Sequence, residues 1–315
     1  MELYKKSYFD NVVIINGTYA SGKSMISPII SSFQRVEIPR KFLIIEQIIN
    51  LYFLKKIELS SVIFLIRHFL DQNFYDQLIG RNINLRLDDE TSIFKAKNTS
   101  ELLERILIKR EPEVIQRHIK EKTIFCLDAH DAFMSFDIWK KINHNFKFIN
   151  IYRNPIDTVA SWYKRGMGRL ENILVNEIPM LKLNNCIVPF YYKKDFKNYI
   201  RHNEMDRVIY MVLSCMKLEY LNYKKYKNYR NCIFIEFEEF ATKTNYYIRK
   251  ILKFLKTDIG KKTNFVLKRE NCPRIIRKED YNYKLSNIKD LASKTNFRKL
   301  LNFEKQFFKR KKNLI

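Results

Sequence analysis

Short apolar runs alternate with long segments of helical periodicity along this chain. Four runs have the length of strands that are buried on both faces, namely Val12–Ile15, Thr123–Leu127, Phe146–Tyr152 and Asn231–Phe237. Gln34–Glu37 can form one further, shorter strand. Because helical segments separate the runs, we expect parallel strands that are joined by right-handed crossovers. The pattern predicts a three-layer α/β fold in which helices flank a parallel β-sheet.

Helical periodicity dominates two long segments, residues 40–120 and 165–230. In the first, apolar residues recur at helical spacing through Leu43–Leu51. We interpret both segments as large helical insertions in a single domain that covers residues 1–270. A basic helical extension is expected to follow at residues 271–315. The chain of 315 residues is 46% hydrophobic, which is enough to bury a sizeable core.

The charge balance is strongly basic. Lys and Arg number 59 against 34 Asp and Glu, which gives a net charge of +25. Such an excess suggests an acidic partner, such as a nucleotide, a sulfated or phosphorylated substrate, or nucleic acid. A general compositional bias toward lysine would produce the same excess as solvated surface charge, so the charge alone does not choose a function.

Cysteine usage and hydropathy bear on the compartment. The chain has an odd number of widely spaced cysteines and no C-x-x-C motif, with Cys126, Cys186, Cys215, Cys232 and Cys272 making up the set. This argues against a disulfide framework or a zinc site and fits a reducing compartment. The first ten residues lack the apolar core of a signal peptide, and no apolar run approaches the ~20 residues of a membrane span. We therefore expect a cytoplasmic protein.

The first apolar run leads directly into the clearest motif of the chain. Gly17 is followed by four residues and then by Gly22-Lys23-Ser24, the G-x-x-x-x-G-K-[ST] spacing of a phosphate loop. Glycines let the backbone curl so that successive N–H groups face one anion, and the helix that follows adds its positive dipole end. The fold is then expected to be P-loop NTPase-like. The expected phosphate-binding residues are Gly17, Thr18, Tyr19, Ala20, Ser21, Gly22, Lys23 and Ser24.

A second motif follows the run that ends at Tyr152. Arg153 comes first, Asn154 and Pro155 are typical of a helix start, and Ser161 lies eight residues beyond Arg153. An arginine at a strand end and a serine on the following helix can hold one phosphate from two sides. Taken alone, the same pattern also fits a capped helix with an ordinary surface arginine.

Together the two motifs resemble those of the sulfotransferases that use 3′-phosphoadenosine 5′-phosphosulfate (PAPS) as co-substrate. In that family the first loop binds the 5′-phosphosulfate, and the Arg and Ser of the second motif bind the 3′-phosphate. The resemblance, which runs from about residue 11 to residue 257, implies these roles for the phosphate loop and for Arg153 and Ser161. It also implies that no metal ion is needed, since a sulfuryl group carries less charge than a phosphoryl group.

The chain departs from the family pattern in two places. Its loop carries a full G-K-S, as kinases do, and the glycine-rich C-terminal motif of the small-molecule enzymes is absent. Basic residues in 269–277 can take the place of that motif, and Arg274 is the candidate.

The resemblance suggests two candidates for the general base that removes the acceptor's proton. In small-molecule sulfotransferases a histidine follows the strand that precedes the Arg–Ser strand, which corresponds to His130, 23 residues before Arg153. In carbohydrate and tyrosyl sulfotransferases a glutamate after the phosphate loop is the base, which corresponds to Glu37, with Glu46 behind it. Lys23 would stabilise the bridging oxygen as the S–O bond breaks. The acceptor would be a small molecule or a carbohydrate.

Two other functions remain open on the sequence. A P-loop kinase would use the same Gly-Lys-Ser, with Asp128 at a strand end as the acid that holds magnesium. A basic nucleic-acid-binding protein would explain the charge, although no nucleic-acid-binding motif supports it. The oligomeric state cannot be read from the sequence. Because ligands of such sheets lie beyond the carboxyl ends of the strands, we expect Gly17, Asp128, Arg153 and Glu238 near the site.

Overall fold

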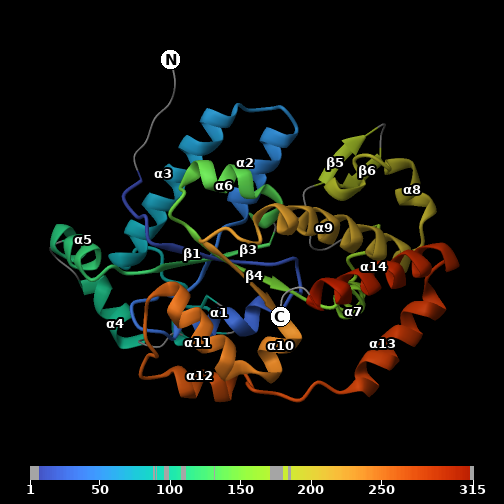
Figure 1. The fold of residues 1–315 in the computed structure, drawn as a ribbon. Coiled ribbons are helices and arrows are strands. Elements are labelled where there is room, and N and C mark those ends of the chain that lie inside the picture. The colour runs from blue at the N-terminus through green and yellow to red at the C-terminus, as the bar shows by residue number, and fades with distance from the viewer. Residues whose placement is uncertain are drawn as a thin grey trace.

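The computed structural model describes residues 7–87, 89, 91–95, 99–107, 111–130, 132–170, 180–183 and 186–312. A five-stranded sheet runs through the middle of the molecule, with helices on both faces (Figure 1). All of its strands are parallel, in the order β2-β3-β1-β4-β7. The predicted α/β fold is confirmed. The strands are β1 (Val12–Asn16), β2 (Arg40–Lys41), β3 (Phe125–Ala129), β4 (Lys147–Tyr152) and β7 (Cys232–Glu236).

The central strand β1 shows why the sheet has two covered faces. All five of its residues are buried, and successive side chains point to opposite sides. Val12 and Ile14 belong to one core, and Val13 and Ile15 belong to the other. Each such side chain contributes about 1.5–3 kcal/mol on burial, so continuous apolar runs stabilise a sheet between two helical layers.

Each face has its own helices. Val13 and Ile15 pack against α1 (Lys23–Ser31), α10 (Phe237–Thr242), α11 (Thr244–Leu255) and α12 (Thr263–Arg269). The other face is covered by α2 (Leu43–Phe53), α3 (Leu59–Leu78) and α6 (Phe136–Ile142). Residues 40–120 are largely helical as predicted, and they also contain η1 (Ile93–Lys95), α4 (Thr99–Glu104), η2 (Arg105–Leu107) and α5 (Glu111–Lys120).

A third core lies beside the sheet, between helices from the second half of the chain. It is built around Trp162, Tyr192 and Leu300, all of them fully or almost fully buried. Its helices are α7 (Pro155–Lys164), α8 (Phe196–Arg201), α9 (Glu204–Tyr226), α13 (Lys278–Leu291) and α14 (Lys294–Lys312). In Figure 1 the two C-terminal helices lie against α7 and α9.

Two details differ from the sequence prediction. Gln34–Glu37 does not form a strand: only Val36 makes an isolated bridge, and β2 begins after Pro39. Arg35 has a left-handed backbone (φ 59°), which interrupts the extended conformation of a strand just before Val36. Residues 165–230 are not only helical, because they contain an antiparallel hairpin and a short 3₁₀ helix. These are β5 (Met180–Leu183), β6 (Cys186–Pro189) and η4 (Phe190–Tyr192).

The strand order defines where a ligand would lie. From β1 the chain moves to one side of the sheet, through β2 and β3, and from β4 it moves to the other side, to β7. The point between β1 and β4 is therefore the topological switch point, outside whose carboxyl end doubly wound sheets bind ligands. The segment 17–22 leaves β1 at this point, and Arg153 leaves β4 there.

Candidate functional site

The segment between β1 and α1 is a tight loop that requires its glycines. Ala20 and Gly22 have left-handed backbones, with φ of 65° and 98°, and the Ser21 N–H donates to the Thr18 carbonyl at 3.0 Å. A Cβ atom on Gly22 would lie 2.0 Å from the ring of Phe237. A Cβ on Gly17 would lie 2.6 Å from the Ile151 carbonyl oxygen. The backbone therefore approaches its neighbours as closely as a phosphate loop must.

Lys23 opens α1 and turns back over the loop. Its side chain is buried, and its ammonium donates to the carbonyl oxygens of Gly17 and Thr18, the second at 3.2 Å. The helix begins directly at the end of the loop, where the Met25 and Ile26 N–H groups donate to the Gly22 carbonyl at 3.2 and 3.3 Å, so its positive dipole end lies beside the loop. Ser24 in the same turn is exposed. The loop thus combines one ammonium with a helix N-terminus.

Arg153 connects β4 to the phosphate loop. Its Nη1 donates to the Ala20 carbonyl at 2.8 Å, and its guanidinium lies 4.9 Å from the centre of the Phe237 ring. Its Nε is buried without a hydrogen-bond partner among the described residues. The two motifs that the sequence separates by more than a hundred residues are therefore in direct contact.

The helix α7 is fixed to the same loop at its far end. The Asn154 side chain caps the helix, as predicted, by accepting from the Ile156 N–H at 2.7 Å. Two turns later, the Trp162 indole N–H donates to the Tyr19 carbonyl at 2.7 Å. Ser161, next to Trp162, is partly buried and accepts a hydrogen bond from Arg165. Of the two predicted residues, Arg153 thus directly precedes α7, and Ser161 lies on α7 next to the residue that contacts the loop.

Arg165 was missed by the sequence analysis. Its guanidinium lies 5.3 Å from the centre of the Tyr19 ring, over the phosphate loop, while it donates to the Ser161 hydroxyl. The signal was present: Arg165 lies four residues after Ser161, so the two side chains share one face of the helix.

His130 also lies beside Tyr19, directly after the end of β3. The two ring centres are 5.3 Å apart. The His130 backbone N–H donates to Oε1 of Glu46 at 2.7 Å, and its Nδ1 lies 3.6 Å from the same oxygen. Both side chains are 12% exposed, so the pair faces a restricted space rather than bulk water. Of the candidate bases, His130 with Glu46 is the one in contact with the phosphate loop.

Glu37 has a different environment. Arg105 holds both of its carboxylate oxygens, with two hydrogen bonds of 2.9 Å, and Gln77 donates to it at 3.1 Å. Burial lowers the pKa of Arg105, but the Glu37 carboxylate outweighs this effect and the pKa is raised. Arg40, beside this pair, has its pKa lowered to about 10 by burial. A carboxylate held by an arginine through both oxygens is a poor proton acceptor, so the geometry favours a structural role for Glu37.

Arg274 lies behind the loop, against the first turn of α1. Its Nη2 donates to the Glu270 carbonyl at 2.6 Å and contacts the Met25 sulfur at 2.7 Å. Its Nε donates to the Asn271 carbonyl at 3.2 Å. The structure therefore places the sequence candidate beside the helix that follows the phosphate loop, with its Nε and Nη2 groups each donating to a backbone carbonyl.

Two acidic residues complete this edge of the sheet. Asp128 accepts a hydrogen bond of 2.6 Å from the Ser27 hydroxyl of α1. Glu238 accepts from the Asn154 N–H at 3.1 Å, and its other oxygen is buried without a partner among the described residues. Burial raises the pKa of Glu238 to about 7, although the Asn154 hydrogen bond acts in the opposite direction.

Within the described ranges, no three or more His, Cys, Asp or Glu side chains come together as metal ligands would. No helix there is both long enough and apolar enough to cross a membrane.

No protein-family model and no curated protein sequence matches this chain. Among solved structures, the chain is similar to a sulfotransferase domain of the curacin biosynthetic pathway, with a TM-score of 0.45 and 11% identity over 80% of this chain and 76% of that one. A sulfotransferase domain of the Synechococcus PCC 7002 olefin synthase has a TM-score of 0.43 and 9% identity, over 94% of this chain and 86% of that one. A sulfotransferase from Mycobacterium avium has a TM-score of 0.42 and 9% identity, over 90% of this chain and 77% of that one. At these TM-scores and identities, function has to be argued from the residues of the chain itself.

Proposed function

We propose that the protein is a PAPS-dependent sulfotransferase, which moves the sulfuryl group to a hydroxyl or amine of an acceptor. The observation that carries this proposal is the direct contact between the phosphate loop and the start of α7, through the 2.8 Å hydrogen bond from Arg153 to the Ala20 carbonyl. One anion site lies in the loop, and a second set of cationic and hydroxyl groups lies next to it. This arrangement suits a nucleotide that carries acidic groups at both its 5′ and its 3′ ends.

The donor would be held by groups of two kinds. Lys23 and the N–H groups at the start of α1 suit the 5′-phosphosulfate. Arg153 and Ser161 suit the 3′-phosphate, and Arg165 adds a second guanidinium beside the Ser161 hydroxyl. Because a guanidinium can present two parallel N–H groups to one phosphate, an arginine is the residue expected at such a site.

The transfer itself needs a base on the acceptor side and a cation on the donor side. The acceptor hydroxyl loses its proton to His130 as its oxygen attacks sulfur, while the S–O bond to the nucleotide phosphate breaks. The electron pair of that bond leaves on the phosphate oxygen, where Lys23 stabilises the developing charge. Glu46, within 3.6 Å of the His130 ring, orients the imidazole and stabilises the imidazolium that forms.

The main rival function is a P-loop kinase, in which Asp128 would hold magnesium. In the structure this carboxylate accepts a 2.6 Å hydrogen bond from Ser27, one turn beyond Ser24. A kinase also has no 3′-phosphate to bind, so it gives no reason for the cluster of Arg153, Ser161 and Arg165 beside the loop.

Calorimetry separates the two functions. We expect 3′-phosphoadenosine 5′-phosphate to bind in the presence of EDTA, and to bind more tightly than ADP with or without magnesium. Equal affinities for the two nucleotides, or binding that appears only with magnesium, would favour the kinase.

A further inference from the structure

A cavity of about 540 Å³ lies beside Glu46, the residue whose carboxylate contacts His130. Its walls come from α2, η3 (Ala132–Ser135), α6, η4 and α9. In Figure 1, α2 lies at the top of the molecule beside the β5–β6 hairpin, and α9 runs below them. Glu46, the partner of His130, is one of the lining residues. The candidate base His130 is therefore connected to this cavity through Glu46 and to the phosphate loop through Tyr19.

The body of the cavity is apolar and aromatic. Phe53, Trp139 and Phe190 line it from three different elements. A second hollow of about 250 Å³ shares Phe53 with it and extends it along α6. A volume of several hundred Å³ is typical of small-molecule sites.

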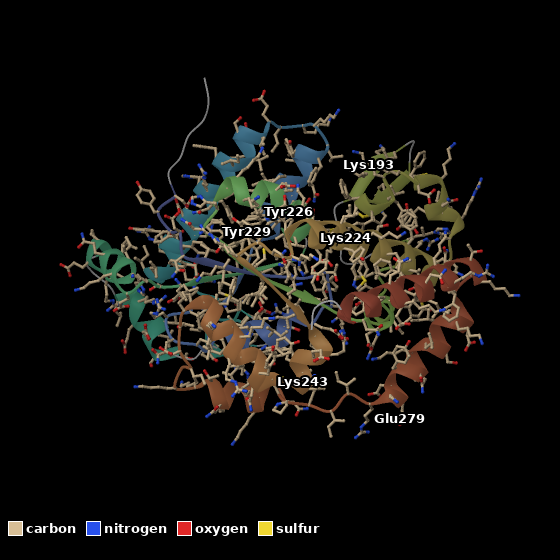
Figure 2. The ribbon with its side chains drawn as sticks, viewed as in Figure 1. Lys193, Lys224, Tyr226, Tyr229, Lys243 and Glu279 are labelled. Carbon is tan, nitrogen blue, oxygen red and sulfur yellow. The ribbon has the colours of Figure 1, made fainter. Side chains whose placement is uncertain are left out.

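The cavity also carries a cluster of positive charge. Lys193 and Lys194 follow η4, and Lys217 is on α9, so all three lie on walls other than the α2 wall that carries Glu46. Figure 2 shows Lys193 beside the hairpin, toward α2. No carboxylate of the described chain lies within salt-bridge distance of any of these lysines, and all three are exposed.

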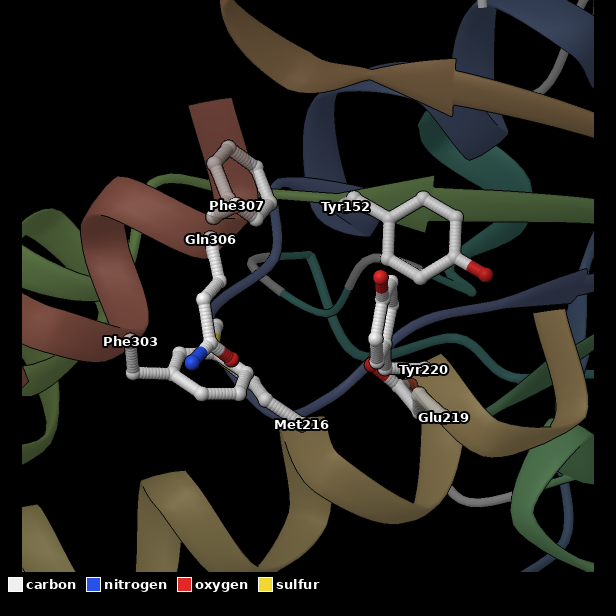
Figure 3. A pocket seen from close by; sticks show the side chains of 7 residues that line it. All are labelled: Tyr152, Met216, Glu219, Tyr220, Phe303, Gln306 and Phe307. Atoms are coloured by element: carbon white, nitrogen blue, oxygen red, sulfur yellow. The ribbon is translucent and has the colours of Figure 1, made fainter. Parts of the chain in front are cut away.

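A different hollow, between β4, α9 and α14, does not compete for this role (Figure 3). Tyr152, Glu219 and Phe303 are among its lining residues, but it holds only about 10 Å³. A space of this size accommodates at most one water molecule.

We propose that the 540 Å³ cavity binds the acceptor, and that the acceptor is an amphipathic anion. Its apolar or aromatic body lies against Phe53, Trp139 and Phe190. Its anionic group lies near Lys193, Lys194 and Lys217, and its reacting hydroxyl lies near His130 and Glu46. This inference rests on the proposed sulfuryl transfer, because it assigns the acceptor of that reaction.

The test uses a hydroxybiphenyl carboxylate, which has its phenol and its carboxylate at opposite ends, and the neutral methyl ester of the same compound. Calorimetry measures the binding of each to the full-length protein saturated with 3′-phosphoadenosine 5′-phosphate. We expect the carboxylate to bind at least about tenfold more tightly than the ester, the size of one hydrogen bond to a charged group. Transfer of labelled sulfuryl from PAPS to the phenol is measured in parallel.

Two lysine variants have the same change in net charge. Lys193→Ala/Lys194→Ala/Lys217→Ala should abolish the preference for the carboxylate. Lys253→Ala/Lys261→Ala/Lys262→Ala, at exposed positions on the opposite face of the sheet, should keep it. Both variants should bind 3′-phosphoadenosine 5′-phosphate as the unmodified protein does. Ser214→Phe, which fills the cavity from α9, should weaken both probes at least about tenfold.

The outcomes separate the inference from the function. If the nucleotide binds but the carboxylate has no advantage, or keeps it in the Lys193/Lys194/Lys217 variant, the acceptor class is wrong while the donor site stands. If the nucleotide does not bind, the proposed function fails. Lysine-dependent probe binding without any transfer to the phenol would make the cavity a ligand site and would overturn its assignment to the acceptor.

Discussion

The indole N–H of Trp162 donates to the carbonyl oxygen of Tyr19 at 2.7 Å. This hydrogen bond joins a helix of the third core to the phosphate loop at the edge of the sheet. Trp162 is almost fully buried, so the position of the loop depends on the packing of α7. The ring of Tyr19 contacts both Arg165 and His130.

Trp162→Phe should therefore loosen the loop while keeping most of the packing. It leaves the Tyr19 carbonyl without its donor, which costs about 1–3 kcal/mol for a buried group. We expect a lower midpoint of urea unfolding and a weaker affinity for 3′-phosphoadenosine 5′-phosphate. Trp139→Phe is the matched control, since Trp139 is equally buried but belongs to the core under α3. If both variants keep the same nucleotide affinity, the Trp162 hydrogen bond does not position the loop.

Arg153→Ala should weaken nucleotide binding selectively. If the guanidinium binds the 3′-phosphate, losing even one charge-assisted hydrogen bond of about 1.5–3 kcal/mol lowers the affinity for 3′-phosphoadenosine 5′-phosphate by roughly ten- to a hundred-fold. Calorimetry should show almost no change for adenosine 5′-phosphosulfate, which lacks the 3′-phosphate. Ser161→Ala should show the same selectivity with a smaller effect, because a neutral hydroxyl donates one weaker bond.

The comparison of the two nucleotides is an internal control. Both share the adenine and the 5′ end, so a folding defect would weaken them together. Equal losses for Arg153→Ala would mean that Arg153 acts through its hydrogen bond to Ala20 as a structural residue, and the kinase would then become the better proposal.

Lys23→Ala should lower kcat more than nucleotide affinity. Removing one group that stabilises developing charge costs about 10²–10³ in kcat, whereas binding of the product nucleotide should weaken less. Single-turnover transfer and calorimetry measure the two effects separately. A variant with a near-normal kcat would exclude the Lys23 ammonium from the chemical step.

His130→Gln should remove the general base, whose contribution is typically 10²–10⁴-fold. We expect kcat to fall by that order and the acidic limb of the pH–rate profile to disappear, while nucleotide affinity is kept. Glu46→Gln should have a smaller effect, because the amide oxygen can still accept from the His130 N–H but cannot stabilise an imidazolium. An unchanged pH profile in His130→Gln would assign the proton transfer to another group.

Glu37→Gln is the control for this experiment. It breaks the bidentate ion pair between Glu37 and Arg105. The two side chains are only 10% and 4% exposed, respectively. Breaking a buried pair costs about 3–5 kcal/mol, so the midpoint of thermal unfolding should fall while kcat of the folded fraction is retained. A large loss of kcat at normal stability would restore Glu37 as a candidate base.

Glu238→Gln should change the pH dependence of stability. Burial raises the pKa of Glu238 from 4.5 to about 7, so between these values the folded state holds a proton that the unfolded state has lost. Stability from this group is present below about pH 4.5 and is lost as the pH rises through 7. Between pH 5 and 8 the free energy of unfolding should therefore fall less in the variant than in the unmodified protein. The two falls should differ by at most about 3 kcal/mol. If urea unfolding shows the same change in the free energy of unfolding with pH in both proteins, the raised pKa of Glu238 is contradicted.

The local parts of the site could be predicted from the sequence, because their determinants are close in the chain. The phosphate loop follows from the spacing of Gly17 and Gly22-Lys23-Ser24, and the cap at Asn154 follows from its neighbours. The pairing of Glu46 with His130 could not be predicted, since it joins α2 to the end of β3 across 84 residues. The same holds for the partner of Glu37: nothing in the sequence near residue 37 indicates that Arg105 occupies its carboxylate.

The β5–β6 hairpin was missed for another reason. Its strands have four residues each, and most of their side chains are partly exposed. Such short, half-covered strands carry too few alternations to stand out against helical periodicity. Yet the following η4 contributes one wall of the cavity, so the part of the molecule that we propose binds the acceptor has the weakest sequence signal.

The cap of α7 is itself held from the far end of the chain. The Asn154 side chain donates to Glu304 at 3.0 Å, and Tyr281 donates to the same buried carboxylate at 2.8 Å. During synthesis, the phosphate loop and Arg153 leave the ribosome long before Glu304 does. Until α14 has been made, Asn154 lacks this partner and the third core lacks one of its helices. The proposed donor site, although its residues lie between positions 17 and 165, therefore depends on a contact that forms only when the last helix has been made.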